Sequence, residues 1–136
     1  MTRLETDALV TGADGPYWDG LIAGTLRLQQ CAACQTWHWP AVWRCSDCGS
    51  WGHDWRTIEP RGTIYSWTRT WHAFGGLEAL AKPFVIAVVE LAAAGGIRIA
   101  GIMEDPGAVY IGQDVSGTIT TTPFGESEVP AVRWHA

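Results

Sequence analysis

The four cysteines of this chain form two pairs, each with two residues between its members. Cys31 and Cys34 make the first pair, Cys45 and Cys48 the second, and the whole motif is C-x2-C-x10-C-x2-C. Each pair can direct two thiolates at one metal ion, and two pairs complete a tetrahedral shell of four sulfur atoms at about 2.3 Å. Because no coordination position stays open, the motif predicts a closed structural site, and we expect Zn²⁺ in it.

Other uses of the cysteines carry less weight. Iron in a rubredoxin-like site would use the same four sulfur atoms and remains the alternative metal. Disulfides are disfavoured because the first residues lack the apolar segment of a secretory signal, so we expect a cytoplasmic protein with reduced thiols. His38 and His53 lie close enough to be substitute ligands. Since four cysteines already fill the shell, we expect both histidines on strand surfaces.

Size and charge limit the classes of protein that this chain can be. Its 136 residues allow one ordinary domain or two very small ones. Nine Lys and Arg against fourteen Asp and Glu give a net charge of −5, and 17% charged with 47% hydrophobic residues is typical of a globular chain. The longest apolar run, residues 84–97, contains Glu90 and two glycines, so we expect no membrane span and no membrane partner. An acidic balance also disfavours binding to phosphate polymers.

The chain divides into three units. Residues 1–25 are predicted to be a flexible leader followed by a short helix, in which Tyr17 and Leu21 are spaced for one helix face. Residues 26–58 form the predicted zinc ribbon, which an alternating strand at residues 25–30 enters. Residues 59–136 form the third unit.

Short β-strands dominate this third unit. Strands are predicted at residues 62–71, 84–91, 97–103, 114–121 and 129–134, with a non-strand excursion at 73–83 that holds one helical turn. Aromatic residues on one side of the first strand and Ile64 on the other predict that both faces of that strand are covered. Pro130 limits the start of the last strand to a sheet edge. Five short strands predict a mainly β protein with a small, partly open barrel, for which the five-stranded OB-fold is the best-populated solution. Periodicity alone does not distinguish it from an SH3-like barrel.

No set of catalytic residues is evident. The sequence contains no G-x-S-x-G, H-E-x-x-H or glycine-rich phosphate loop, and its four cysteines are assigned to the metal. His72 with Glu78, and His53 with Asp54, are neighbours in sequence without further support as acid–base pairs. We therefore expect no catalytic residue in this chain.

Several motifs together resemble a known family. Their order is similar to that in small bacterial and archaeal proteins, catalogued as acyl-CoA-associated, in which a rubredoxin-like zinc ribbon precedes an OB-fold. The matching segments are residues 17–21, 26–34, Trp39-Pro40, 45–50, 61–68 and 83–91. The resemblance covers nearly the whole chain.

This resemblance implies an accessory role. Members typically form hetero-oligomers with thiolase-superfamily proteins, including steroid side-chain aldolases, or alternatively with hotdog-fold enoyl-CoA hydratases. The partner supplies the catalytic residues of the aldolase, lyase or acyltransferase reaction, and acyl-CoA is expected at the shared interface. Ribbons and OB-folds also bind nucleic acids, so a single-stranded nucleic-acid-binding module is the alternative function.

The density of aromatic residues exceeds what we expect for this family. The chain has nine tryptophans, of which five lie in or beside the cysteine motif. Exposed aromatic side chains are typical of interfaces, although they could equally pack the ribbon against the barrel. The residues predicted to contact a partner or acyl-CoA are Trp37, Trp39, Trp43, Trp71, His72, Phe74 and Arg69.

Overall fold

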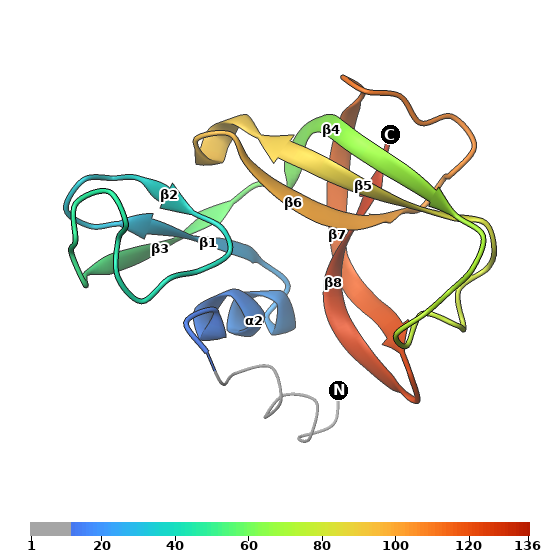
Figure 1. The fold of residues 1–136 in the computed structure, drawn as a ribbon, viewed down its shortest axis with the longest axis horizontal. Helices are drawn as coiled ribbons and strands as arrows, with labels where there is room; N and C mark the ends of the chain where they lie inside the picture. The colour runs from blue at the N-terminus through green and yellow to red at the C-terminus, as the bar shows by residue number, and fades with distance from the viewer. Residues whose placement is uncertain (1–11) are drawn as a thin grey trace.

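The computed structural model describes residues 12–136 and consists mostly of strands (Figure 1). Most of the predicted leader, residues 1–11, lies outside the described residues. In chain order the elements are α2 (Gly15–Ile22), β1 (Leu26–Cys31), β2 (Trp37–His38), β3 (His53–Ile58), β4 (Arg61–Thr70), β5 (Phe84–Leu91), the 3-10 helix η1 (Ala92–Ala94), β6 (Ile97–Met103), β7 (Asp114–Phe124) and β8 (Ser127–His135). Among these residues, no helix has the length and apolar character needed to cross a membrane.

Helix α2 forms where the spacing of apolar residues predicts it. Pro16 occupies the first turn, where a missing N–H costs no hydrogen bond. The Trp18 indole N–H donates to the Asp14 carboxylate at 2.9 Å, one turn away. Tyr17 and Leu21 are buried, so the helix turns this face towards the rest of the protein.

The ribbon is a three-stranded antiparallel sheet in the order β2-β1-β3. Its central strand, β1, alternates buried Leu26 and Leu28 with more exposed residues, as the sequence predicts. These two leucines belong to the same hydrophobic cluster as the barrel core. The ribbon is therefore attached to the barrel through β1, and α2 contacts both β1 and β8 (Figure 1).

The remaining five strands close into a barrel with the order β4-β5-β6-β8-β7. All neighbours are antiparallel except β6 and β8, which pair in parallel over only two residue pairs. Gly62 makes the closure possible, because a Cβ atom there would lie 2.2 Å from the Glu90 carbonyl oxygen. The prediction of a mainly β protein with a short N-terminal helix and a five-stranded barrel after the ribbon is confirmed.

Three details of the barrel differ from the predictions. Strand β7 continues three residues beyond the predicted end, and β8 begins at Ser127, so the two form a longer hairpin. Strand β4 has an irregularity between Ile64 and Ser66 that leaves Tyr65 exposed, and the prediction that both faces of this strand are covered is wrong. The excursion after β4 contains a hydrogen-bonded turn from Leu77 to Leu80 and no helix.

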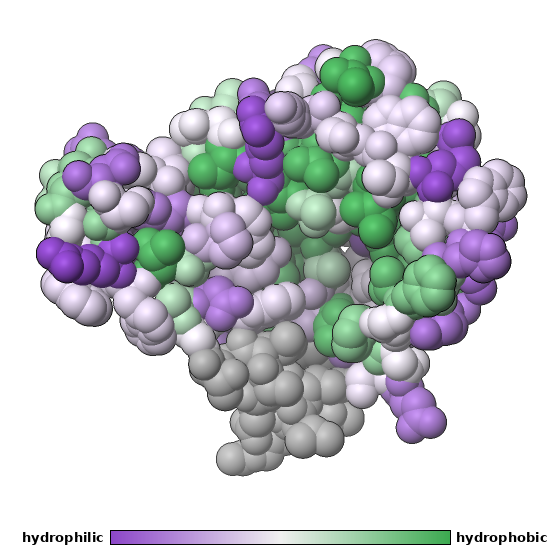
Figure 2. Space-filling view, viewed as in Figure 1, coloured by the Kyte–Doolittle hydropathy of each residue, from purple (hydrophilic) through white to green (hydrophobic). Residues whose placement is uncertain are grey.

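The outer surface of β5 and β6 is largely apolar. Along β5, Ile86 and Val88 point away from a core made by Val85, Ala87 and Val89. Figure 2 shows hydrophobic side chains gathered over these two strands in the centre of this view. This surface therefore lacks the band of cations that polyanion binding needs.

Candidate metal centre

The fold brings the four cysteine sulfur atoms together. The Sγ atoms of Cys31 and Cys48 are 3.5 Å apart, those of Cys34 and Cys45 are 3.6 Å apart, and all four lie within 4.8 Å of one another. All four cysteines are free, so these distances do not represent disulfides. A tetrahedron with metal–sulfur bonds of about 2.3 Å has edges of about 3.8 Å, so the donor set fits a four-coordinate zinc ion.

Two loops of the same backbone conformation present these sulfur atoms. In the first, the Cys31 N–H donates to the Thr36 carbonyl and the Gln35 N–H donates to the Cys31 carbonyl. In the second, the Cys45 N–H donates to the Ser50 carbonyl and the Gly49 N–H donates to the Cys45 carbonyl. Gln35 and Gly49 both have a positive φ, which lets each chain turn sharply after its pair of cysteines. The first cysteine of each pair is buried and the second is exposed.

Local hydrogen bonds favour thiolates at two of the sulfur atoms. The backbone N–H of Cys34, which outweighs the opposing effect of burial, and the N–H of Ala33 lower the pKa of Cys31 to about 6. Hydrogen bonding with the side chain and, to a smaller extent, the backbone of Thr36 lowers the pKa of Cys34. A cation bound at this site would therefore meet sulfur atoms that are already prepared to lose their protons.

The thiol proton of Cys48 is held more tightly than those of Cys31 and Cys34. Although the Ser50 N–H favours the thiolate, hydrogen bonds to the neighbouring thiols, first of all Cys31, raise the pKa of Cys48 to about 12. Zinc binding must displace this proton, because only the thiolate coordinates the ion. Metal binding at this centre is consequently coupled to proton release and weakens as the pH falls.

The prediction that His38 lies on a strand surface is wrong. His38 is only 8% exposed, and its Nε2 atom lies 3.3 Å from the Cys45 Sγ. Successive side chains of a strand point to opposite faces, and β2 consists of Trp37 and His38. Because Trp37 packs against the barrel core, His38 faces the sulfur atoms. His53 is partly buried, and its Nε2 donates to the Trp43 carbonyl oxygen at 2.9 Å.

Two further side chains that the sequence analysis did not single out support the loops. Gln29 is buried, donates through Nε2 to the Val42 carbonyl at 2.8 Å and accepts the Val42 N–H at 2.9 Å. The Thr36 hydroxyl donates to the Asp47 carboxylate at 2.9 Å and thereby links the two loops. The polar Gln29 inside an otherwise alternating strand is the one signal that could have revealed its role.

The structure separates the predicted contact residues into two groups. Trp37 and Trp39 are partly buried and pack against the hydrophobic core. Trp43, Trp71 and Phe74 are 67%, 65% and 78% exposed.

The remaining two predicted contact residues lie near the excursion. His72 is exposed, with its ring 6.4 Å from that of Phe74. Arg69 donates to the Pro106 carbonyl oxygen and stacks on Trp67. The excursion itself contacts the tip of the β7–β8 hairpin, because the Gly125 N–H donates to the Gly76 carbonyl at 2.7 Å.

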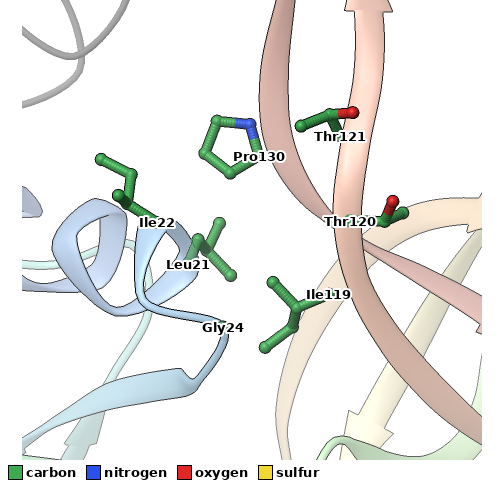
Figure 3. Close-up of a pocket in the computed structure, with 7 residues that line it drawn as sticks. All are labelled: Leu21, Ile22, Gly24, Ile119, Thr120, Thr121 and Pro130. Atoms are coloured by element: carbon green, nitrogen blue, oxygen red, sulfur yellow. The ribbon is translucent and has the colours of Figure 1, made fainter. Parts of the chain in front are cut away.

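Two of the described cavities have mostly apolar walls. One of about 270 Å³ lies between α2 and the β7–β8 hairpin (Figure 3). Its lining consists of Leu21, Ile22, Gly24, Ile119, Thr120, Thr121 and Pro130, and includes no titratable side chain. A groove of about 350 Å³ separates the ribbon from the barrel and has Trp18, Trp39, Pro40 and Phe124 in its walls.

The neighbours in sequence that might have formed acid–base pairs have other partners. Asp54 lies 3.9 Å from Arg56 in an exposed ion pair, and His53 bonds to a carbonyl oxygen instead. Glu78 accepts the Gly76 N–H. Neither neighbouring pair is therefore preorganised for proton transfer.

Comparison with protein-family models matches most of the chain. Residues 18–53 match the model described as "ChsH2, rubredoxin-like zinc ribbon domain", and residues 55–126 match "ChsH2, C-terminal OB-fold domain". This chain belongs to the ChsH2 family of zinc-ribbon and OB-fold domains. The matched ribbon model and the clustered cysteines together agree with a structural zinc.

Solved structures share the ChsH2-type fold over nearly the whole chain. A chain of the "Ltp2-ChsH2(DUF35) aldolase" is 24% identical, with a TM-score of 0.73 over 90% of this chain and 92% of that one. A DUF35 protein of unknown function from Sulfolobus solfataricus is 20% identical, with a TM-score of 0.62 over 97% of this chain and 90% of that one. At these identities the likeness establishes the fold.

One curated relative is more similar in sequence and much longer. It is a "Probable enoyl-CoA hydratase alpha subunit" from Thermomonospora curvata, 37% identical over 81 residues. The match covers 57% of this ChsH2-family chain and 24% of the relative, so the chain spans about a quarter of that protein.

Proposed function

We propose that this chain is an accessory subunit of an acyl-CoA-processing complex and that its partner is a thiolase-superfamily aldolase. The observation that supports this proposal most directly is the fold match over 92% of a chain from the Ltp2-ChsH2 aldolase. In the proposed complex the partner supplies the catalytic residues, and this chain completes the assembly and contributes to the acyl-CoA-binding interface. A cytoplasmic location and a role in lipid or steroid side-chain degradation belong to the same proposal.

Exposed aromatic side chains support a docking role. Trp71 and Phe74 project from the excursion after β4, and half-exposed Phe124 lies on the β7–β8 hairpin that this excursion contacts. Trp43 is exposed on the ribbon. Tryptophan and phenylalanine side chains bury large apolar areas when a partner covers them, and a few such residues commonly dominate the free energy of association. We propose Trp43, Trp71, His72 and Phe74 as contact residues.

A hotdog-fold enoyl-CoA hydratase is the second candidate partner. The 37% identical relative is named as a hydratase alpha subunit, and the matching segment is a quarter of it. The same kind of domain is thus part of a longer polypeptide in that protein. This observation favours a hydratase partner, which could bind the same exposed aromatic residues that are proposed to contact an aldolase.

The charge distribution argues against the nucleic-acid alternative. Within residues 12–136, four arginines form ion pairs with carboxylates, namely Arg56, Arg61, Arg98 and Arg133. Together with a net charge of −5, this leaves few cations to replace the counterions of a phosphate backbone. We propose that the barrel surface serves protein contact instead.

Co-expression tests the proposal. The chain is produced with a thiolase-like and with a hotdog hydratase-like protein from the same genome, and each mixture is analysed by size-exclusion chromatography with light scattering and by acyl-CoA turnover. We expect a stable hetero-oligomer with one of the two, and activity only when that partner is present. Turnover of an acyl-CoA by the isolated chain would overturn the accessory role.

Surface variants then test the docking residues. Replacing Trp71 and Phe74 with alanine is expected to weaken association at least tenfold, because truncating an interface hot spot costs about 2 kcal/mol. Tyr110→Ala is the matched control, since Tyr110 is also 61% exposed but lies on the β6–β7 loop. Isothermal titration calorimetry measures both, and equal losses would remove these residues from the interface.

A further inference from the structure

Among residues 12–136, His38 is the histidine whose ring contacts a cysteine sulfur atom. Its Nε2 lies 3.3 Å from the Cys45 Sγ, within the range of an N–H···S hydrogen bond. The second histidine of the ribbon, His53, is directed at a carbonyl oxygen, although the two rings are only 6.2 Å apart. Proximity alone therefore does not place a histidine against the metal centre.

The backbone holds His38 in this orientation. His38 pairs with Gln29 of β1, whose side chain also holds Val42 of the loop that leads to Cys45. Its neighbour Trp37 packs against Gly95, where an added Cβ would lie 2.6 Å from the indole ring. With Trp37 fixed against the barrel, strand alternation directs the next side chain towards the sulfur atoms.

The chemistry of the contact determines which atom donates. A metal-bound thiolate has no proton and can only accept a hydrogen bond, so the contact is favourable when the His38 Nε2 carries the proton. We propose that His38 is a positioning residue of the metal centre, whose Nε2–H donates to the Cys45 thiolate, orients it and offsets part of its negative charge.

The cysteine array gives this bond a physical consequence. Four thiolates around a divalent cation have a net charge of −2, and N–H groups directed at the sulfur atoms offset it. Outer hydrogen bonds of this kind typically change metal affinity 10–100-fold. Because His38 is nearly buried, water cannot readily replace its bond when the side chain is removed.

Three variants distinguish the N–H from the ring. In His38→Gln, the Nε2 amide is the same number of bonds from Cα as the histidine Nε2, so it can still donate to Cys45. In His38→Asn the amide is one bond shorter, and His38→Leu has no donor. His53→Leu is the control, because it removes a nearby ring whose bond is to the Trp43 carbonyl.

Two measurements on the full chain test the proposal. The first is the sulfur-to-cobalt charge-transfer band of the Co²⁺-substituted protein, which moves to longer wavelength when a sulfur atom loses a hydrogen bond. The second is zinc affinity, measured by competition with a chromophoric chelator. We expect the Leu and Asn variants to show the longer-wavelength band and about tenfold weaker zinc binding, and the Gln and His53 variants to keep the wild-type band.

Several results would overturn the proposal. An unchanged band in both the Leu and the Asn variants means that no N–H···S bond was lost. A change in the ligand-field bands that indicates loss of a nitrogen ligand means that His38 binds the metal itself. If the Leu variant does not fold, the Gln and Asn variants decide, and identical spectra from these two contradict a role for the Nε2–H.

Discussion

Gln29 shows how one side chain takes the place of a neighbouring strand. Its amide makes two hydrogen bonds with the Val42 backbone, where β2 has already ended. Gln29→Ala leaves the N–H and the carbonyl of Val42 without these partners in a part-buried site. We expect the free energy of unfolding of the zinc-loaded protein to fall by about 2 kcal/mol, as measured by urea denaturation.

The adjacent Gln30 provides the control for this prediction. Its amide donates to the Gln35 carbonyl and accepts the Arg56 Nε–H, both in solvent-exposed positions where water can replace the lost partners. Gln30→Ala should therefore cost less than about 1 kcal/mol. Equal losses from the two variants would show that the Val42 bonds contribute nothing beyond ordinary strand packing.

The buried Tyr17 should make the free energy of unfolding fall at high pH. Burial, with a smaller contribution from the charge of Asp14, raises its pKa from 10.0 to about 12. Between these values the unfolded chain loses the phenolic proton while the folded chain retains it, so the stabilising contribution is complete below pH 10 and is lost as the pH rises towards 12. The expected loss is about 2 kcal/mol across this range.

Tyr17→Phe removes the ionisable group and keeps the ring. The variant should therefore show a flatter dependence of unfolding free energy on pH between 10 and 12 than the wild type. Tyr110→Phe makes the same substitution at an exposed tyrosine and is the matched control. Urea denaturation at intervals of half a pH unit measures all three proteins, and parallel curves for wild type and Tyr17→Phe would refute the assignment.

At the scale of elements, the sequence predicted best those strands whose pattern is local. The β5–β6 hairpin has the predicted bounds, because alternating aliphatic residues flank two glycines that both adopt positive φ. Strand β3 was not identified, since its residues are mostly polar and its partner β1 lies more than twenty residues away. The end of β7, which contains Pro123, was not predicted, and the strand extends there because its pairing with β8 continues to Phe124.

The ribbon and the barrel should respond differently to metal removal. Core residues of the barrel come from five paired strands, whereas the loops that carry the cysteines have little buried apolar surface of their own. We expect chelation, or Cys45→Ser, to expose the amides of residues 31–53 to hydrogen exchange while those of β5 and β6 stay protected. Hydrogen–deuterium exchange followed by mass spectrometry reports each segment separately.

Strand β1 is expected to behave differently from the cysteine loops when the metal is removed. Leu26 and Leu28 belong to the core shared with the barrel, so the start of β1 should keep partial protection without metal. Unchanged exchange throughout the ribbon after complete zinc removal would contradict a structural role for the ion. Metal content by elemental analysis confirms that removal is complete.

At the scale of the molecule, aromatic packing joins the two units. The rings of Tyr17 and Trp39 are 4.4 Å apart, which links α2 to the loop between the cysteine pairs. Trp37 lies against Gly95, next to η1 of the barrel unit. Two of the seven predicted contact residues therefore have a structural task, and sequence alone could not separate them from exposed Trp43.

This difference predicts opposite outcomes for two tryptophans of one loop. Trp39→Ala removes a ring packed on the shared core and should cost about 3 kcal/mol or more. It should also divide the single thermal transition of the zinc-loaded protein into separate ribbon and barrel transitions, because the contact with Tyr17 is lost. Trp43→Ala removes an exposed ring and should leave one transition at nearly the wild-type temperature. Differential scanning calorimetry distinguishes the cases, and a single transition at the wild-type temperature in Trp39→Ala would show that the contact between Trp39 and Tyr17 does not couple the ribbon to the barrel.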